Sequence, residues 1–367
     1  MTRALFPLLT ALTLTACPPT TGLDDSGGTP DPDTGVDPGQ HSTAVIVTVA
    51  SDYTTGTLAT VDLGSWEVSD ELFVTSGDPS VSVSEGAVFQ LNRFGYDAVR
   101  RYEPGSWTAP LWEEALEDLS NPHVARVCDG AVFVTLYDQG EVGVYDLDSG
   151  AALGSVDLSA FDDADSSGPE PSTMVVYDGK LYVGLERLDR DGGWVDAGGM
   201  VVEIDCEQRA VTRSWSVGGN TAVHAWLEGE GVLVRARAFG DDAGGLYALD
   251  PAADSLELRV DMGDEQPSEV GAYGGAAVVT SQSADWSSSS VHHLDLDAGT
   301  IVSSVQTDAY YTDVAANDWG QAWVTTGESW MNPDAPSGLW VYDISDGSLV
   351  SDVPIQLSLH PRAVAFY

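Results

Sequence analysis

Basic residues are scarce in this sequence. Its 367 residues include 14 Lys and Arg against 58 Asp and Glu, so the formal net charge is −44, and Lys180 is the sole lysine. A nucleic-acid backbone repels such a protein, which excludes DNA and RNA as partners. So many carboxylates are typical of proteins from salty habitats, where dissolved ions screen the self-repulsion; an acidic surface that concentrates cations is the alternative.

The sequence also lacks a hydrophobic run long enough to cross a bilayer. The apolar run from Ala4 to Leu14 follows a single positive charge at Arg3, which predicts a secretory signal peptide over residues 1–16. The segment Leu14-Thr15-Ala16-Cys17 resembles the bacterial lipobox, and this resemblance implies cleavage before Cys17 and a lipid on its sulfur. Ordinary secretion with a free Cys17 is the alternative.

The mature protein is therefore expected outside the cytoplasm, tethered to a bacterial membrane by its lipid. Pro18 follows Cys17 where an Asp would resemble an inner-membrane retention signal, so the outer membrane is favoured. Residues 17–43 are mostly Pro, Gly, Thr, Ser and Asp. Such a stretch buries too little apolar area to fold, which predicts a disordered linker.

Cysteine is almost absent from the remaining chain, where only Cys128 and Cys206 are left. An even number of cysteines in an oxidising compartment favours a disulfide between them. They end a first and a third strand of neighbouring repeats, so a separation too large to bridge, with two free thiols, is the alternative.

Helical periodicity is nearly missing, and only residues 111–119 (LWEEALEDL) are predicted to be helical. The rest is self-similar, with short strands between Gly, Asp and Pro turns and a period of about 46 residues. This predicts an all-β, seven-bladed β-propeller over residues 44–367, with first strands starting near Pro79, Pro122, Pro171, Asn220, Pro267, Tyr311 and Pro361. The last of these strands, His360 to Tyr367, is expected to complete the first blade and close the ring.

Two segments carry a resemblance to a known family. VFVTLYDQGEVGVYDLDSG at residues 132–150 and LWVYDISDG at residues 339–347 are similar to the YVTN-type repeats of bacterial seven-bladed propellers. The resemblance implies the fold and says little about activity. Some seven-bladed relatives are lactonases or quinoprotein dehydrogenases.

The residues after the first-strand starts are expected to form a polar ring at one mouth of the central channel. His123 and Arg362 are its cationic members and are predicted to bind an anion or a carbonyl; solvated packing is the alternative. The ring comprises Ser80, His123, Ser172, Thr221, Ser268, Thr312 and Arg362.

Aromatic residues occur in all seven loops between second and third strands, on the same rim. They predict a binding face for a sugar or a cation, and the alternative is that the rings fold back and cap the blades. These rings include Tyr96, Tyr137, Trp194, Trp286 and Trp330. In the longest loop, the spacing of Asp189, Asp191 and Asp196 is compatible with Ca²⁺, with a solvated acidic loop as the alternative.

Catalytic motifs are absent: the chain has no G-x-S-x-G, H-E-x-x-H, C-x-x-C or dinucleotide-binding glycine pattern. We therefore expect a monomeric, membrane-anchored propeller that binds a ligand or an envelope protein without catalysis and without a cofactor. The alternative is a lactonase-like hydrolase or a quinoprotein-like dehydrogenase with its site at the channel mouth. A buried carboxylate pair beside His123 or Arg362 would favour the enzyme.

Overall fold

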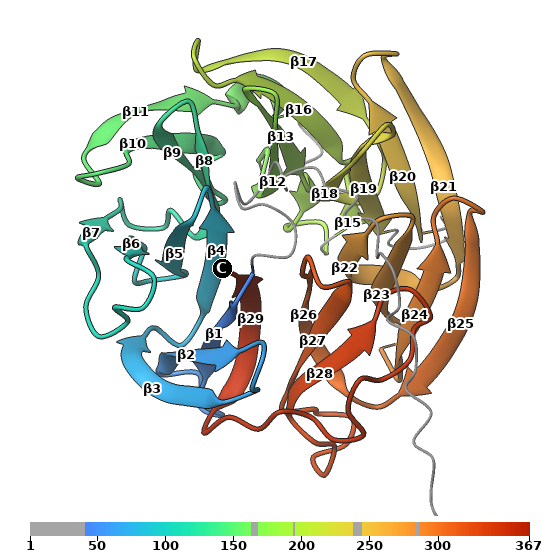
Figure 1. Ribbon diagram of the computed structural model, residues 1–367. Helices are drawn as coiled ribbons and strands as arrows, with labels where there is room; N and C mark the ends of the chain where they lie inside the picture. The colour runs from blue at the N-terminus through green and yellow to red at the C-terminus, as the bar shows by residue number, and fades with distance from the viewer. Residues whose placement is uncertain (1–40, 163–167, 194, 238–243, 284–285) are drawn as a thin grey trace, which may run out of the picture.

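The fold is a ring of small β-sheets around a central channel (Figure 1). The computed structural model describes residues 41–162, 168–193, 195–237, 244–283 and 286–367. Within these residues the chain forms seven blades, and the helical content is one short 3₁₀ turn, η1 (Ser159–Phe161). The prediction of an all-β, seven-bladed propeller is therefore confirmed. Cys17 and Trp194 lie outside the described residues.

The first four blades contain the strands up to Ser216 together with the last strand of the chain. Blade 1 contains β29 (His360–Phe366), β1 (Thr43–Val49), β2 (Gly56–Asp62) and β3 (Val68–Thr75). Blade 2 contains β4 (Pro79–Ser84), β5 (Ala87–Asn92), β6 (Ala98–Tyr102) and β7 (Trp112–Ala115). Blade 3 contains β8 (Pro122–Cys128), β9 (Ala131–Leu136), β10 (Glu141–Asp146) and β11 (Ala152–Asp157). Blade 4 contains β12 (Pro171–Tyr177), β13 (Lys180–Leu185), β16 (Met200–Asp205) and β17 (Ala210–Ser216).

Blades 5 to 7 complete the ring. Blade 5 contains β18 (Asn220–Leu227), β19 (Gly231–Arg237), β20 (Gly244–Asp250) and β21 (Ser255–Gly263). Blade 6 contains β22 (Gln266–Tyr273), β23 (Ala276–Gln282), β24 (Ser289–Asp295) and β25 (Thr300–Thr307). Blade 7 contains β26 (Tyr310–Ala316), β27 (Gln321–Gly327) and β28 (Gly338–Asp343), and a two-stranded hairpin of β14 (Leu188–Asp189) and β15 (Val195–Asp196) extends from blade 4.

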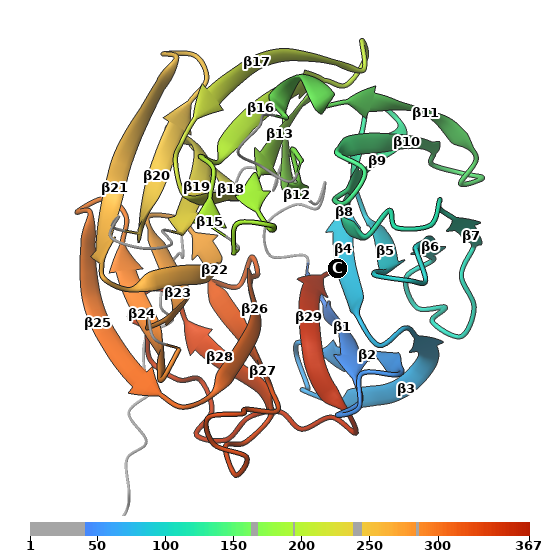
Figure 2. The same ribbon diagram turned by 180° about the vertical axis from the view of Figure 1, so that it is seen from behind.

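The last strand closes the ring, as predicted. β29 pairs antiparallel with β1, from Ala44 opposite Phe366 to Val49 opposite His360. Seen from behind, β29 lies beside β1 and faces the channel (Figure 2). The closure converts two sheet edges into one continuous ladder, so the ring opens only when β29 detaches.

The inner strands β4, β8, β12, β18, β22, β26 and β29 begin at one end of the channel, the upper mouth, and end at the lower mouth. Hydrogen bonds at equivalent positions of neighbouring strands show this common direction: the Ser82 and Ser84 hydroxyls accept from the Ala125 and Val127 amides (3.2 and 2.9 Å). An inner strand has a hydrogen-bonded neighbour on one side only, so some of its backbone amides lack a partner within the sheet. The short serine side chains of the neighbouring blade supply that partner.

Both described ends of the chain lie at the lower mouth. The Ser42 amide donates to the Tyr367 carbonyl (2.7 Å), and the His41 amide donates to the Asp318 carboxylate (3.0 Å) in the turn between β26 and β27. The His41 ring stacks on Phe366, with centroids 6.0 Å apart. These contacts hold the start of the propeller against its last strand.

The prediction of a helix over residues 111–119 is wrong. Trp112 to Ala115 form β7, the outer strand of blade 2. Trp112 is buried and its indole N–H donates to the Leu147 carbonyl (2.9 Å), while Glu113 pairs across the strands with Arg100 (3.1 Å). Alternate residues of β7 thus face the core and the solvent, which is the period of two of a strand. The segment is rich in Leu, Glu and Ala, which favour helices, and this composition led to the wrong prediction.

Cys128 and Cys206 are joined by a disulfide in the structure, with their Cα atoms 5.9 Å apart. It links the end of β8 to the residue after β16, and so fastens blade 3 to blade 4. Both cysteines are buried in the core cluster between these blades. The third strand therefore approaches the neighbouring first strand closely at this end of the blade.

Among the described residues, no helix has the length and apolar character needed to cross a membrane.

Candidate functional site

The central channel of the described structure is a hollow with a volume of about 960 Å³. Inner strands of all seven blades line the channel. Four of the 14 basic residues of the protein also line it, namely Arg93, Arg126, Arg235 and Arg362. The predicted ring members Ser80, His123, Ser172, Thr312 and Arg362 line the channel. The hydroxyls of this ring serve the backbone, since Ser80 donates to the His123 carbonyl (2.9 Å) and Thr312 to the Pro361 carbonyl (3.1 Å).

Two carboxylates in the channel wall were missed by the sequence interpretation. Glu269 and Asp313 each follow a predicted ring position, Ser268 or Thr312, by one residue. The register of β22 shifts between Pro267 and Val270, and that of β26 shifts between Tyr311 and Asp313. Because a β-bulge sets two residues opposite one, it breaks the strict alternation on which the ring prediction was based.

Threonine side chains of the second strand stabilise these bulges. The Thr280 hydroxyl accepts from the Glu269 amide (3.2 Å), and the Thr325 hydroxyl donates to the Asp313 carbonyl (3.3 Å). Thr135 repeats the arrangement in blade 3, where its hydroxyl accepts from the Val124 amide (3.0 Å). The bulge turns the side chains of Glu269 and Asp313 toward the channel, and the threonine hydrogen bond stabilises the bulged backbone.

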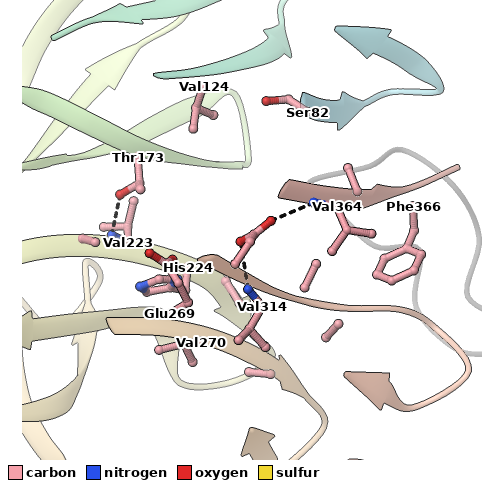
Figure 3. Close-up of a pocket in the computed structure, with 18 of the residues that line it drawn as sticks. Ser82, Val124, Thr173, Val223, His224, Glu269, Val270, Val314, Val364 and Phe366 are labelled. Carbon is pink, nitrogen blue, oxygen red and sulfur yellow. Dashed lines mark hydrogen bonds between the residues drawn. The ribbon is translucent and has the colours of Figure 1, made fainter. Parts of the chain in front are cut away.

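Glu269 and Asp313 form a carboxyl pair on neighbouring blades. Protein surrounds both side chains, which are exposed only to the channel. This burial, together with repulsion from Asp313, raises the pKa of Glu269 to about 7. Burial raises the pKa of Asp313 to about 6, even though its carboxylate accepts hydrogen bonds from the Val364 and Val314 amides (2.8 and 2.9 Å; Figure 3).

Two neutral imidazoles lie in the same channel. His224 of β18 and Glu269 of β22 both line the channel (Figure 3), and burial with the nearby Arg235 guanidinium lowers the pKa of His224 to about 3. Burial and the guanidinium of Arg93 hold the pKa of His123 well below its usual range. Within the described residues, the Nε2 atoms of His123 and His224 have no hydrogen-bond partner. Both nitrogen atoms are buried, and a water molecule or ligand that reached them would supply the missing hydrogen bond.

The guanidinium groups of Arg93 and Arg362 flank one carboxylate at the upper mouth. Their Nε atoms lie 3.4 and 3.6 Å from the Asp78 oxygens. Burial acts against the charge of Arg362, but the carboxylates of Asp78, Glu269 and Asp313 outweigh it and raise the Arg362 pKa. Arg362 thus stays cationic beside the carboxyl pair. Its predicted place at the mouth agrees with this geometry.

Tyr137 is buried behind the channel-lining residue His123 instead of lying exposed on the rim. Its ring stacks on His123 with centroids 4.3 Å apart, and only 8% of its surface is exposed. Its hydroxyl donates to Glu186 (2.9 Å), which also accepts from the Asn220 amide (2.9 Å). Burial and the charge of Glu186 raise the pKa of Tyr137, so the phenol keeps its proton. Tyr137 orients His123.

The other rim aromatics of the described chain are exposed to solvent. Tyr96, Trp286 and Trp330 are 65%, 46% and 56% exposed. Trp286 lies under the Arg237 guanidinium at 4.8 Å, and Trp330 packs against Tyr310 with centroids 4.8 Å apart. Trp330 thus packs on the residue that begins β26, and Trp286 pairs with an arginine of blade 5.

The predicted calcium residues show no assembled site in the described part of the chain. The Asp189 carboxylate accepts from the Gly192 amide of its own turn (2.6 Å), Asp191 is exposed, and the Asp196 side chain is outside the described set. Among described residues, no three His, Cys, Asp or Glu side chains gather to hold a metal ion.

A serine–histidine contact also occurs in blade 6, away from the channel. The Ser281 hydroxyl lies 2.7 Å from His292 Nε2, but it donates its proton to Glu265 (2.6 Å). The hydroxyl is therefore an acceptor toward His292, and both Ser281 and His292 are 2% exposed. This is a buried hydrogen-bond network without access for a substrate.

The sequence matches no known protein-family model and no curated protein. Its fold is similar to many solved structures, at low sequence identity. A Lactobacillus plantarum protein has a TM-score of 0.64 at 11% identity, over 89% of this chain and 100% of its own. A putative 6-phosphogluconolactonase from Bacteroides fragilis has a TM-score of 0.62 at 12% identity, over 90% of this chain and 98% of its own.

The periplasmic gluconolactonase of Pseudomonas aeruginosa is also similar in fold. Its TM-score is 0.59 at 14% identity, over 89% of this chain and 99% of its own. At such identities the likeness establishes the propeller fold alone.

Proposed function

We propose that this protein is a hydrolase that opens a lactone, or a similar small ester rich in oxygen, at the upper mouth of the channel. The observation that carries this proposal is the pair of Glu269 and Asp313 beside the Arg362 guanidinium. One member of the pair keeps a proton near neutral pH and the other loses it, as general acid–base catalysis requires. This arrangement favours the enzyme over a purely passive binding propeller.

The pair supplies both proton transfers of lactone hydrolysis. Asp313 accepts two backbone hydrogen bonds that favour its ionised form, so it takes a proton from a water molecule. The water oxygen attacks the carbonyl carbon, and the negative charge that develops on the carbonyl oxygen is stabilised by Arg362. Protonated Glu269 then donates to the ring oxygen as the ring C–O bond breaks.

The proton count of the pair is unchanged after turnover. One water is consumed, one hydroxy acid is formed, and a proton passes from Asp313 back to Glu269. The hydroxy acid releases its own proton to solvent. Two proteins of similar fold are named for lactone substrates, which supports this substrate class.

Acid release from glucono-δ-lactone, followed in a pH-stat and corrected for spontaneous hydrolysis, tests the proposal. Glu269→Gln and Asp313→Asn should each lower kcat by about 100-fold or more. The control, Glu257→Gln, changes an exposed carboxylate of the outer strand β21 and should leave the rate unchanged. The pH profile of the unmodified protein should peak between about 6 and about 7, the pKa values of the pair.

A hydrolysis rate no higher than the spontaneous rate, across δ- and γ-lactones, would overturn the enzyme proposal. The second candidate, ligand binding without catalysis, would then explain the site. It is favoured by the unpartnered Nε2 atoms of His123 and His224, which suit a polar ligand without requiring a reaction.

We also propose that the protein is lipid-anchored through Cys17 outside the cytoplasm. The signal peptide and the lipobox-like segment support this location, and one protein of similar fold is periplasmic. Cys17→Ser should move the protein from the membrane fraction to the soluble fraction. Mass spectrometry of the mature N-terminus should find lipid on Cys17, and an unmodified N-terminus would contradict the proposal.

A further inference from the structure

A second hollow adjoins the upper mouth, and we call it the rim pocket. It has a volume of about 260 Å³ and lies between the loops of blades 1, 2 and 7. Thr312 and Arg362 line both the rim pocket and the channel. A ligand held by Arg362 in the mouth therefore has the rim pocket directly beside it.

Aromatic rings form much of the rim pocket wall. Tyr53 comes from the loop after β1, Phe94 and Tyr96 come from the loop after β5, and Tyr310 begins β26. Tyr53, Phe94 and Tyr96 are 58%, 68% and 65% exposed. These aromatic rings are exposed to water and are grouped around one hollow. Such a grouping of exposed apolar surface is typical of a ligand-binding site.

The loops that carry these rings are held in defined conformations. The Tyr53 amide donates to the Ala50 carbonyl (2.9 Å), and Tyr53 and Phe94 have positive φ angles of 55° and 30°. A Cβ atom on Gly77 would lie 1.8 Å from the Tyr53 carbonyl oxygen, so only glycine allows this close packing. Backbone strain of this kind is retained where the surrounding structure enforces it.

Polar groups occur between the rings. Asp78, Glu328 and His360 line the rim pocket, and the His360 ring is held by the Ser51 and Ser337 hydroxyls (2.9 and 2.8 Å). A flat hydrocarbon ring would cover the aromatic walls but would also strip water from the Glu328 carboxylate and from the remaining acceptor positions of Asp78. A sugar ring has apolar faces for stacking and hydroxyls along its edge that can donate to Asp78 and Glu328.

We propose that the rim pocket is a subsite for a cyclic sugar unit attached to the sugar acid or lactone that Arg362 binds in the mouth. The preferred substrate is then the lactone of a disaccharide acid, and a free monosaccharide lactone is a smaller substrate that occupies the mouth alone. This inference rests on the proposed function for the identity of the group in the mouth. The subsite itself is tested by binding alone.

Isothermal titration calorimetry in 0.5 M NaCl separates the two claims. Gluconate represents the mouth ligand alone, whereas cellobionate and lactobionate are gluconates that carry a second, cyclic sugar. We expect at least one of these disaccharide acids to bind with a Kd about tenfold or more below that of gluconate. Tyr53→Ala and Tyr96→Ala should remove this advantage and leave gluconate binding unchanged.

Trp286→Ala is the matched control, because Trp286 is an exposed rim aromatic outside the rim pocket. Equal affinities for gluconate and both disaccharide acids would overturn the subsite, even if glucono-δ-lactone is hydrolysed. Phenylacetate carries an aromatic hydrocarbon ring in place of the second sugar. If its affinity exceeds that of acetate by the same factor by which the disaccharide acids exceed gluconate, the assignment of the rim pocket to a sugar is overturned. A preserved preference without any lactone hydrolysis would refute the proposed enzyme and retain the subsite.

Discussion

The carboxyl pair predicts a stability effect that can be measured without knowing the substrate. Replacing Glu269 with glutamine should stabilise the protein at pH 8 and have a much smaller effect at pH 5. The folded protein binds more protons at Glu269 than the unfolded chain does between pH 4.5 and about 7. Stability from this group is therefore present at low pH and is lost as the pH rises through about 7.

The size of the effect follows from the two pKa values. A pKa of about 7 in the folded state against 4.5 for an ordinary glutamate corresponds to roughly 3 kcal/mol above pH 7, at about 1.4 kcal/mol per tenfold change. Glu269 faces the water-accessible channel and is coupled to Asp313, so part of this energy is screened. We expect Glu269→Gln to gain roughly 1–2 kcal/mol more at pH 8 than at pH 5.

Urea unfolding at both pH values, in constant 0.5 M NaCl, provides the measurement. Glu257→Gln removes one negative charge from the exposed face of β21, and it controls for the general relief of self-repulsion. The same change in unfolding free energy at pH 5 and pH 8 for Glu269→Gln would refute the argument that burial raises the pKa of Glu269.

Three further predictions concern the fold. Replacing Cys128 and Cys206 together by serine should lower the free energy of unfolding by about 2–4 kcal/mol, and a reductant should abolish the difference from the unmodified protein. Deleting residues 360–367 removes β29 and should eliminate cooperative thermal unfolding, seen as a broad transition in calorimetry. Raising NaCl from about 0.1 to about 1 M should increase Tm, because salt screens a net charge of −44; a flat or falling Tm would contradict this.

The blade architecture was predictable because it depends on features that repeat. Turns such as Asp129-Gly130, with φ angles of 48° and 70°, recur after the first strand and require residues that tolerate positive φ. Six of the predicted first-strand starts and the closing strand lie within one residue of the observed β4, β8, β12, β18, β22, β26 and β29. Local turn chemistry and period were sufficient for this part of the structure.

The site was predictable only in part, because it depends on departures from the repeat. Arg362 and His123 line the channel as expected, but Glu269 and Asp313 face it through bulges that strict alternation cannot reveal. A threonine at the facing position of the second strand, as at Thr280, is the one signal that would have indicated a bulge. The direction of the Tyr137 side chain could not be predicted from the sequence either. Its hydroxyl donates to Glu186, which belongs to another blade and is distant in the sequence.

The position of the two described chain ends has a practical consequence. His41 and Tyr367 lie together at the lower mouth, held by Asp318 and by the strand pairing of β29. A protein immobilised through His41 or Tyr367 therefore turns its lower mouth toward the support and its upper mouth, with Arg93 and Arg362, toward the medium. Molecules dissolved in the medium then reach the upper mouth first.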